Sequence, residues 1–341
     1  VSLADHVEDL RQETIERLAI WPGLLNLAEL EVHYEREDAA LWTFMAPSGR
    51  PSFTPQLLED FEQWQDGILR SFGPGLIDLK FLVLGSRAPG VFCYGGDLEL
   101  FQKLIRSGDR NGLVRYGYRC VDILHRNIHA LDLPMLTIAL VQGEALGGGF
   151  EALLSFDFII AEKGSRFGLP EVMFGLFPGM GAHAILSRRV GTAMADRMIL
   201  RNEIFSAEQL FEMGVVHQIC EPGEGIAAAR KFITREARHH AGLLGSRRAM
   251  RRVAPLPVEE LKSVVDIWAD SALELREQDL KLMSKLVAAQ ERREINVFHL
   301  ADVGCGLTHE RLVGAMAIRL CRKCRRRNSG NHRRSRRAHE T

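Results

Sequence analysis

The first half of the chain alternates between two patterns of apolar residues, one typical of strands and one typical of helices. Strands are predicted at 30–34, 39–44, 79–84, 135–141 and 157–161. Helices are predicted at 2–20, around 57–64 and over 98–131. Strands that alternate with helices in this way predict a layered α/β fold.

The second half has mainly helical spacing. From Gly181 onward most of the chain is predicted to be helical, with Gly214 and Gly223 as breaks. Two stripes of apolar residues, within 261–275 and 282–290, lie at helical spacing. Such stripes belong to the core in most proteins, so we expect both helices to pack against the α/β part.

Length and composition favour a soluble globular protein. The chain has 341 residues, of which 46% are hydrophobic, enough for a substantial core. No apolar run approaches the roughly 20 residues that cross a bilayer, and Val1–His6 lacks the basic-then-apolar layout of a secretory signal. Six cysteines are scattered along the chain, which is typical of reduced thiols. We therefore expect a cytoplasmic protein without disulfides or membrane contact.

The formal net charge of zero conceals a basic C-terminus. Residues 322–341 contain nine Lys or Arg and one acid, so the rest of the chain carries 35 bases and 43 acids, a net charge of −8. The basic segment has no apolar periodicity, which favours a disordered tail over nucleic-acid binding. Cys321 and Cys324 resemble half of a zinc site, but no second pair lies at a suitable spacing, so no metal is expected.

A glycine turn followed by a carboxylate is the strongest chemical signal. Gly147, Gly148 and Gly149 come directly before an apolar helical pattern, so their amides are expected at a helix N-terminus, where they suit a developing negative charge. Glu151 lies in the otherwise apolar first turn, where an unpaired charge is costly. Glu171 follows Pro170 and has two interpretations. It is either a catalytic carboxylate or an acid in the first turn of a short helix, where it complements the helix dipole.

Five motifs occur in an order that resembles the enoyl-CoA hydratase/isomerase (crotonase) superfamily, over roughly residues 30–290. They are Gly95-Gly96-Asp97, Gly143 to Glu151, Phe167 to Glu171, Phe177 to Gly181 and Phe205 to Gln209. The segments Tyr94 to Leu98 and Phe174 to Ala182 resemble more closely the bacterial diffusible signal factor synthases. The resemblance implies a crotonase-like spiral of ββα units with a C-terminal helical region. It divides the chain into an N-terminal helical extension (1–29), a catalytic core (30–235), C-terminal helices covering the acyl site (236–300) and the basic tail (301–341).

The resemblance also implies an active site. Glu151 and Glu171 share the proton transfers, and the sequence leaves open which is the acid and which the base. Backbone amides from the Gly95-Gly96 turn and from Gly148 form an oxyanion hole. The implied substrate-binding residues are Leu146, Gly147, Leu169, Met173, Phe174, Trp268 and Leu286.

The implied function is synthesis of a cis-2-unsaturated fatty acid quorum-sensing signal. The enzyme dehydrates a 3-hydroxyacyl group on acyl carrier protein and then hydrolyses the enoyl thioester, without a further cofactor. Two alternatives stay open: a hydratase or isomerase of acyl-coenzyme A, and a non-catalytic acyl-binding partner of a sensor kinase. We expect a homo-oligomer, a trimer or hexamer, and a basic docking patch for the carrier that draws on Lys103, Arg106, Arg188 and Arg189.

Overall fold

The computed structural model describes residues 19–303. Residues up to Ile295 form one unit, and the described residues after it are the end of the last helix. The predicted N-terminal helix at 2–20 lies almost entirely outside the described residues, as does most of the predicted tail at 301–341.

A six-stranded sheet forms the centre of the first unit. Its strand order is β1-β2-β3-β5-β7-β10. The strands are β1 (Leu30–Glu35), β2 (Ala40–Met45), β3 (Phe81–Ser86), β5 (Leu136–Val141), β7 (Phe158–Glu162) and β10 (Gln218–Cys220). Only the β1–β2 hairpin is antiparallel; the other pairs are parallel. All five predicted strands are confirmed. The prediction missed β10, a half-buried strand of three residues that is too short to show a period.

A second, four-stranded sheet has the order β4-β6-β8-β9. Its strands are β4 (Val91–Cys93), β6 (Glu144–Leu146), β8 (Arg166–Gly168) and β9 (Ile204–Ser206). Each has three residues, so periodicity predicts none of them. The parallel pair β6–β8 places the chain after Leu146 beside the chain after Gly168. The glycine turn and the segment that begins with Glu171 therefore leave the same edge of this sheet.

The remaining chain is largely helical. The α-helices are α2 (Pro55–Ser71), α3 (Leu98–Arg106), α4 (Arg110–Ile128), α5 (Gly148–Leu153), α6 (Ala182–Val190), α7 (Thr192–Leu200), α8 (Ala207–Glu212), α9 (Gly225–Glu236), α10 (His240–Val253), α11 (Val258–Leu273) and α12 (Glu277–Val303). Short 3₁₀ helices are η1 (Pro22–Leu25), η2 (Ala130–Asp132), η3 (Glu171–Phe174) and η4 (Ala237–His239).

The single long helix predicted over 98–131 is wrong. The chain forms α3 and α4, separated at Gly108, whose φ of 66° is left-handed. Asp109 then begins α4, because its carboxylate accepts a hydrogen bond from Gly112 N at 2.8 Å. Asp97 caps α3 in the same way, by accepting from the amides of Glu99 and Leu100.

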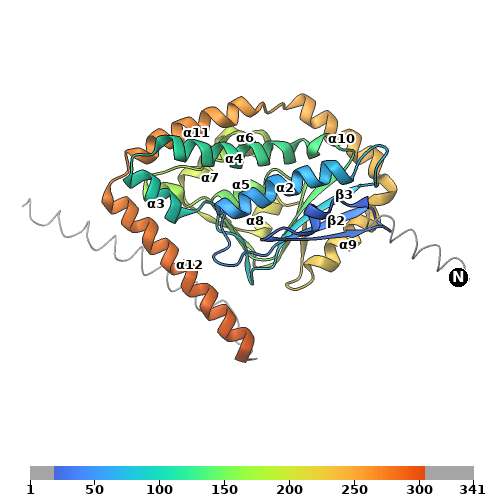
Figure 1. Ribbon diagram of the computed structural model, residues 1–341, viewed down its shortest axis with the longest axis horizontal. Helices are drawn as coiled ribbons and strands as arrows, with labels where there is room; N and C mark the ends of the chain where they lie inside the picture. Colours follow the sequence, from blue (N-terminus) through green and yellow to red (C-terminus); the bar gives the residue numbers. More distant parts are fainter. Residues whose placement is uncertain (1–18, 304–341) are drawn as a thin grey trace, which may run out of the picture. The chain divides into compact units, whose positions relative to one another are not determined.

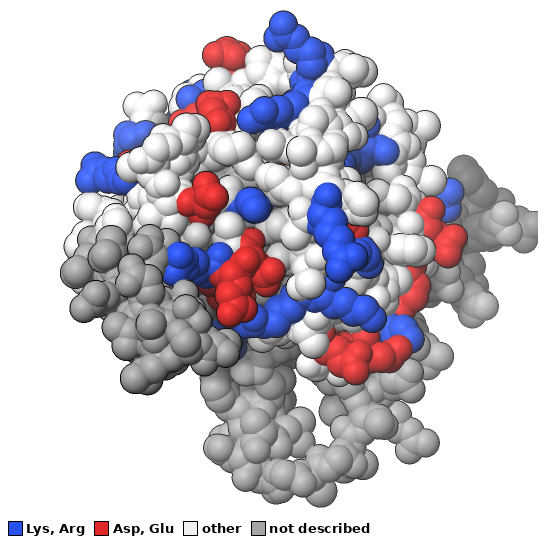
Figure 2. Space-filling view, turned by 90° about the vertical axis from the view of Figure 1, so that its right-hand side faces the viewer, with Lys and Arg blue, Asp and Glu red and all other residues white. Residues whose placement is uncertain are grey.

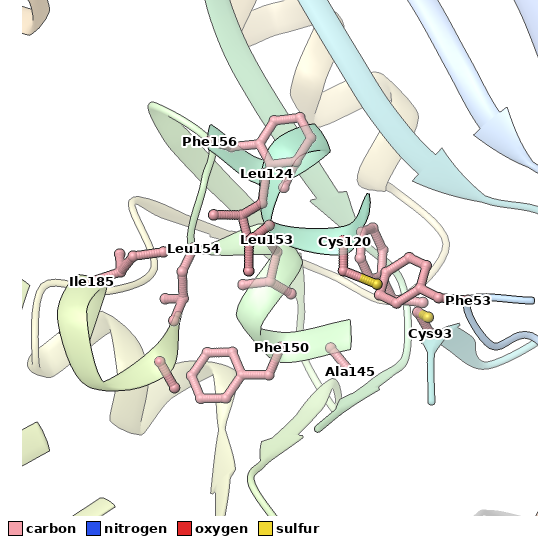
Figure 3. Packing of buried hydrophobic residues seen from close by; sticks show 14 of the residues in the cluster. Phe53, Cys93, Cys120, Leu124, Ala145, Phe150, Leu153, Leu154, Phe156 and Ile185 are labelled. Carbon is pink, nitrogen blue, oxygen red and sulfur yellow. The ribbon is translucent and has the colours of Figure 1, made fainter. Parts of the chain in front are cut away.

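Helices cover both faces of the six-stranded sheet (Figure 1). On one face, Phe232 and Ile233 of α9 and Leu244 of α10 pack on strand residues such as Phe158. The larger core lies on the other face. There Trp64 of α2 donates a hydrogen bond from Nε1 to Thr43 Oγ1 of β2 at 2.9 Å. Helix α5 lies in this larger core, and Figure 3 shows its Phe150, Leu153 and neighbouring side chains. The site described next begins at α5.

Candidate functional site

The glycine turn leads directly from β6 into α5, as the sequence predicted. Gly147 precedes α5 with φ 54° and ψ −131°, a conformation that a residue with a Cβ rarely adopts. A Cβ on Gly147 would also lie 2.7 Å from Glu171 Oε1. Glycine at this position therefore allows the Glu171 carboxyl to lie against the backbone of the turn.

The Gly95-Gly96 turn lies against the start of α5. A Cβ on Gly95 would lie 2.5 Å from the Gly148 nitrogen, and a Cβ on Gly148 would lie 3.4 Å from the Gly96 nitrogen. Gly95 has φ 89°, again in the left-handed region. Two glycine turns from distant parts of the sequence thus bring the amides of Gly96 and Gly148 close together, as an oxyanion hole requires.

Glu151 is a buried carboxylate held by backbone amides. Its side chain lies on α5 and the residue is 1% exposed. Its Oε1 atom accepts hydrogen bonds from Met180 N and Ala182 N, both at 2.9 Å. Burial raises the pKa of the Glu151 carboxyl to about 7, and the amide bonds oppose this rise. A group with this pKa changes protonation near neutral pH, which is what a general acid or base needs.

Glu171 is the first residue of η3, and its carboxyl points inward. Among the described residues, its buried Oε2 atom has no hydrogen-bond partner. Burial and the nearby charge of Glu151 raise the pKa of Glu171 well above its usual value. The residue does begin a short helix, but its carboxyl faces the interior instead of solvent. This geometry favours a functional role over simple interaction with the helix dipole.

Both carboxyls face one cavity, which is also lined by Gly96, Gly147 and Gly148. Three further predicted residues line it, namely Phe174, Trp268 and Leu286. Trp268 comes from α11 and Leu286 from α12, so the C-terminal helices do cover this cavity. We call it the outer cavity.

Four residues of the predicted site do not line the outer cavity. Gly95 packs behind Gly148, and Leu146 lies on β6. Leu169 is 1% exposed within the larger core. Met173 is 52% exposed, because η3 turns its side chain toward solvent while Phe174 turns inward. The predicted substrate contacts of Leu146, Leu169 and Met173 therefore find no support in the geometry.

Sequence reasoning missed many of the residues that line the outer cavity. From the first half of the chain these are Tyr94, Leu98, Phe101, Tyr116, Gly117 and Pro170. From the second half they are Phe177, Gly179, Met180, Val265 and Gln290. Phe101 and Tyr116 stack edge to face, with ring centroids 4.9 Å apart, and Phe101 also meets Trp268 at 5.0 Å. The helical spacing of apolar residues predicts that Phe101 and Tyr116 lie on the inner sides of their helices. It does not predict that they line the same cavity.

The predicted basic patch is only partly available. Arg189 is half-buried, and it donates hydrogen bonds to the carbonyl oxygens of Leu154 and Phe156. Arg188 forms a two-point ion pair with Glu260. Lys103 and Arg106 are exposed on α3. Figure 2 shows a different side of the molecule, the one that is on the right in Figure 1 and away from α3; on that face Lys and Arg lie interspersed with Asp and Glu.

A model of the family described as "Enoyl-CoA hydratase/isomerase" matches residues 77–294. The chain belongs to this family. The crotonyl-CoA hydratase of Syntrophomonas wolfei is 37% identical over 157 residues, which cover 46% of this chain and 58% of that protein. The 2,3-dehydroadipyl-CoA hydratase of Escherichia coli is 30% identical over 172 residues, covering 50% and 61%. The matched part thus spans less than two thirds of these relatives.

Two solved structures illustrate the fold that this chain shares with known proteins. DspI of Pseudomonas aeruginosa is 25% identical with a TM-score of 0.59, covering 71% of this chain and 96% of that one. The enoyl-CoA hydratase of Bacillus halodurans has a TM-score of 0.61 at 19% identity, covering 76% and 100%, which shows the fold alone. No helix among the described residues is long and apolar enough to cross a membrane.

Proposed function

We propose that this protein synthesises a cis-2-unsaturated fatty acid signal from a 3-hydroxyacyl group carried on acyl carrier protein. One observation carries the proposal: Glu151 and Glu171 face the same cavity as the adjacent amides of Gly96 and Gly148. A thioester carbonyl that accepts from those amides has its C2 and C3 atoms within the space that the carboxyls face. The arrangement suits proton removal next to a thioester.

The pKa directions suggest how the two carboxyls divide the dehydration. Two amides stabilise the ionised form of Glu151, whereas Glu171 has a buried oxygen without a partner among the described residues and keeps its proton more firmly. Glu151 then takes the C2 proton as the enolate oxygen accepts from the two amides. The electron pair forms the C2–C3 double bond, Glu171 gives its proton to the 3-hydroxyl, and water leaves.

The same groups suffice for release of the free acid. After dehydration Glu171 is ionised and Glu151 is protonated. Glu171 can take a proton from a water molecule that attacks the thioester carbonyl, and the amides of Gly96 and Gly148 hold the resulting oxyanion. The C–S bond breaks as Glu151 gives its proton to the departing thiolate. Both carboxyls return to their starting states, and the products are the enoic acid and the carrier thiol.

The choice of substrate rests on two further features. The outer cavity is walled by aromatic and aliphatic side chains such as Phe174, Trp268 and Leu286, which suit a fatty acyl tail. The motifs around Tyr94 and Phe177 resemble those of the signal synthases. A second candidate, hydration or isomerisation of acyl-coenzyme A, is favoured by the hydratase names of the curated relatives.

The deciding experiment is incubation of the purified protein with 3-hydroxydodecanoyl carrier protein and, separately, with the corresponding coenzyme A thioester. Products are identified by mass spectrometry and double-bond geometry. We expect free cis-2-dodecenoic acid from the carrier-protein substrate. A trans-enoyl thioester, formed only from coenzyme A and without free acid, would replace this proposal with the hydratase.

A binding role beside catalysis is tested separately. The double variant Glu151→Gln/Glu171→Gln removes the proton-transfer groups and keeps the side-chain volumes. If it still binds the receiver region of a sensor kinase, the binding role is independent of turnover. Loss of this binding in a folded double variant would count against that role.

A further inference from the structure

A second cavity lies on the other side of Met180 from the site described above. It is lined mainly by apolar side chains from α2, α4 and α5, among them Leu58 and Ile123. Four of the lining residues are labelled in Figure 3, which shows them around α5: Phe53, Cys120, Leu124 and Phe156. We call it the inner cavity. Helices α2 and α4 contribute to the lining of the inner cavity, whereas α11 and α12 contribute to that of the outer cavity.

The two cavities share one lining residue, Met180, which lies next to the candidate oxyanion hole. The Met180 sulfur would lie 2.7 Å from a Cβ on Gly148. On α4, Tyr116 lines the outer cavity and Cys120, one turn later, lines the inner one. The Met180 side chain is unbranched and has three rotatable bonds, so it can change position at little cost. A chain that starts at the Gly148 amide therefore meets a movable side chain, and the inner cavity lies beyond it.

Two buried amide groups give the inner cavity a polar end. Gln65 is fully buried and Asn127 is 5% exposed, and both line this cavity. The Gln65 Nε2 atom donates to the Ile123 carbonyl at 2.8 Å. Asn127 Nδ2 donates to Ser155 Oγ at 2.8 Å, and Ser155 uses its own proton on Ala152 O.

These bonds fix the nitrogen side of each amide, so the carbonyl oxygens are the free ends. Among the described residues, neither Gln65 Oε1 nor Asn127 Oδ1 has a hydrogen-bond partner. Buried side-chain acceptors in folded proteins are usually paired. An alkyl chain that pushed against these oxygens would seal them from any donor, which is unfavourable. The two oxygens thus oppose further entry of a purely apolar chain.

We propose that the inner cavity holds the distal part of the acyl chain, reached past Met180, and that Gln65 and Asn127 limit the length of chain that the site accepts. This inference rests on the proposed function, because it assumes an acyl thioester at the two glutamates. It adds a specificity-determining compartment outside the residues that the sequence placed in the acyl site.

Two substitutions test the compartment in opposite directions. Ile123→Phe fills the cavity from a partly buried position on α4. We expect it to lower the ratio of kcat/KM for long to short 3-hydroxyacyl pantetheine thioesters by about tenfold or more, since one methylene in an apolar pocket has an effect of that size. Asn127→Leu keeps the branched shape and the number of side-chain heavy atoms and removes the polar oxygen, so the ratio should rise. Leu286→Phe, in the outer cavity only, should lower turnover of all lengths alike.

The substrates run from six to fourteen carbons, and the melting temperature of each variant shows whether it is folded. Leu58→Phe replaces Ile123→Phe if the latter does not fold, because it fills the same cavity from α2. A length profile that is unchanged in a folded filling variant and in Asn127→Leu would overturn the proposal.

Failure of the proposed function is recognised separately. If the wild-type protein turns over none of these thioesters, binding of free saturated fatty acids of the same lengths is measured by calorimetry on Glu151→Gln/Glu171→Gln. The inner compartment then predicts that Ile123→Phe, added to this background, weakens binding of the long acids more than that of the short ones. Equal weakening at all lengths would reject the compartment.

Discussion

Two buried carboxylates, one within helix α5 and one shortly after it, differ in their surroundings. Asp157, just past the end of the helix, accepts hydrogen bonds from the backbone and hydroxyl of Thr137 and forms an ion pair with Arg251 at 2.8 Å. Glu151, in the first turn, accepts only from backbone amides, and the described residues place no cation within ion-pair distance of it or of Glu171. Charge neutralisation makes Asp157 a structural group. At the glutamates no such cation opposes the effect of burial, which raises the pKa values of both carboxyls and prepares them for proton transfer.

The largest expected effect is loss of turnover when either glutamate becomes an amide. Glu151→Gln and Glu171→Gln keep the side-chain shape and remove the ability to transfer a proton. We expect each to lower kcat by about 10²–10⁴-fold, the usual contribution of a positioned acid or base. Single-turnover assays with the 3-hydroxyacyl thioester measure this. Activity that persisted within a few-fold in both variants would exclude the carboxyl pair from the chemistry.

The opposite result is expected at the other end of α5. Asp157→Ala leaves Arg251 without its buried partner, which typically costs about 3–5 kcal/mol in the free energy of unfolding. Turnover per folded molecule should change little, because Asp157 does not line the outer cavity. Urea unfolding and active-site titration measure the two quantities. If Asp157→Ala were stable but inactive, the assignment of Asp157 as a structural carboxylate would be wrong.

The dependence of rate on pH gives a smaller but specific effect. Glu151 acts as a base only when ionised, and its pKa is raised to about 7, so kcat/KM should rise as the pH increases through that value. At higher pH, ionisation of Glu171 removes the acid and the rate should fall. The rate profile is then bell-shaped. In Asp157→Ala the acidic limb should stay in place; an acidic limb near pH 4 in the wild type would contradict the assigned base.

How far the sequence predicted these features depends on how local they are. The Glu151 and Glu171 pair, the glycine turn and the apolar runs of β3, β5 and β7 are each contained in a short segment, and the structure has them where the sequence placed them. The outward direction of the Met173 side chain was not predictable, because it depends on η3 being a 3₁₀ helix.

Features that need two distant segments were not predictable. The amide bond from Met180 to Glu151 joins a loop to a helix, and neither segment alone shows that the loop will fold over the carboxyl. The inner cavity likewise needs α2, α4 and α5 together. The break at Gly108 was visible as a glycine beside Asp109, a residue suited to begin a helix, but apolar spacing on both sides masked it.

The smallest expected effect is the change in melting temperature when Glu171 becomes Gln. The sign of this change separates the two kinds of carboxylate. A carboxyl whose pKa is raised in the folded state binds more protons there than in the unfolded chain, so its contribution to stability falls as the pH rises above the unfolded value of about 4.5. Glu171→Gln cannot ionise. We therefore expect its melting temperature to exceed that of the wild type by a few degrees at pH 8, and the difference to shrink toward pH 5. Asp157→Asn is the matched control, because it removes the ion pair with Arg251 and should lower the melting temperature at pH 8. Scanning calorimetry of both variants at the two pH values checks the signs. If Glu171→Gln were as destabilised at pH 8 as Asp157→Asn, the Glu171 carboxylate would be a stabilised structural group, and its assignment as the acid would fail.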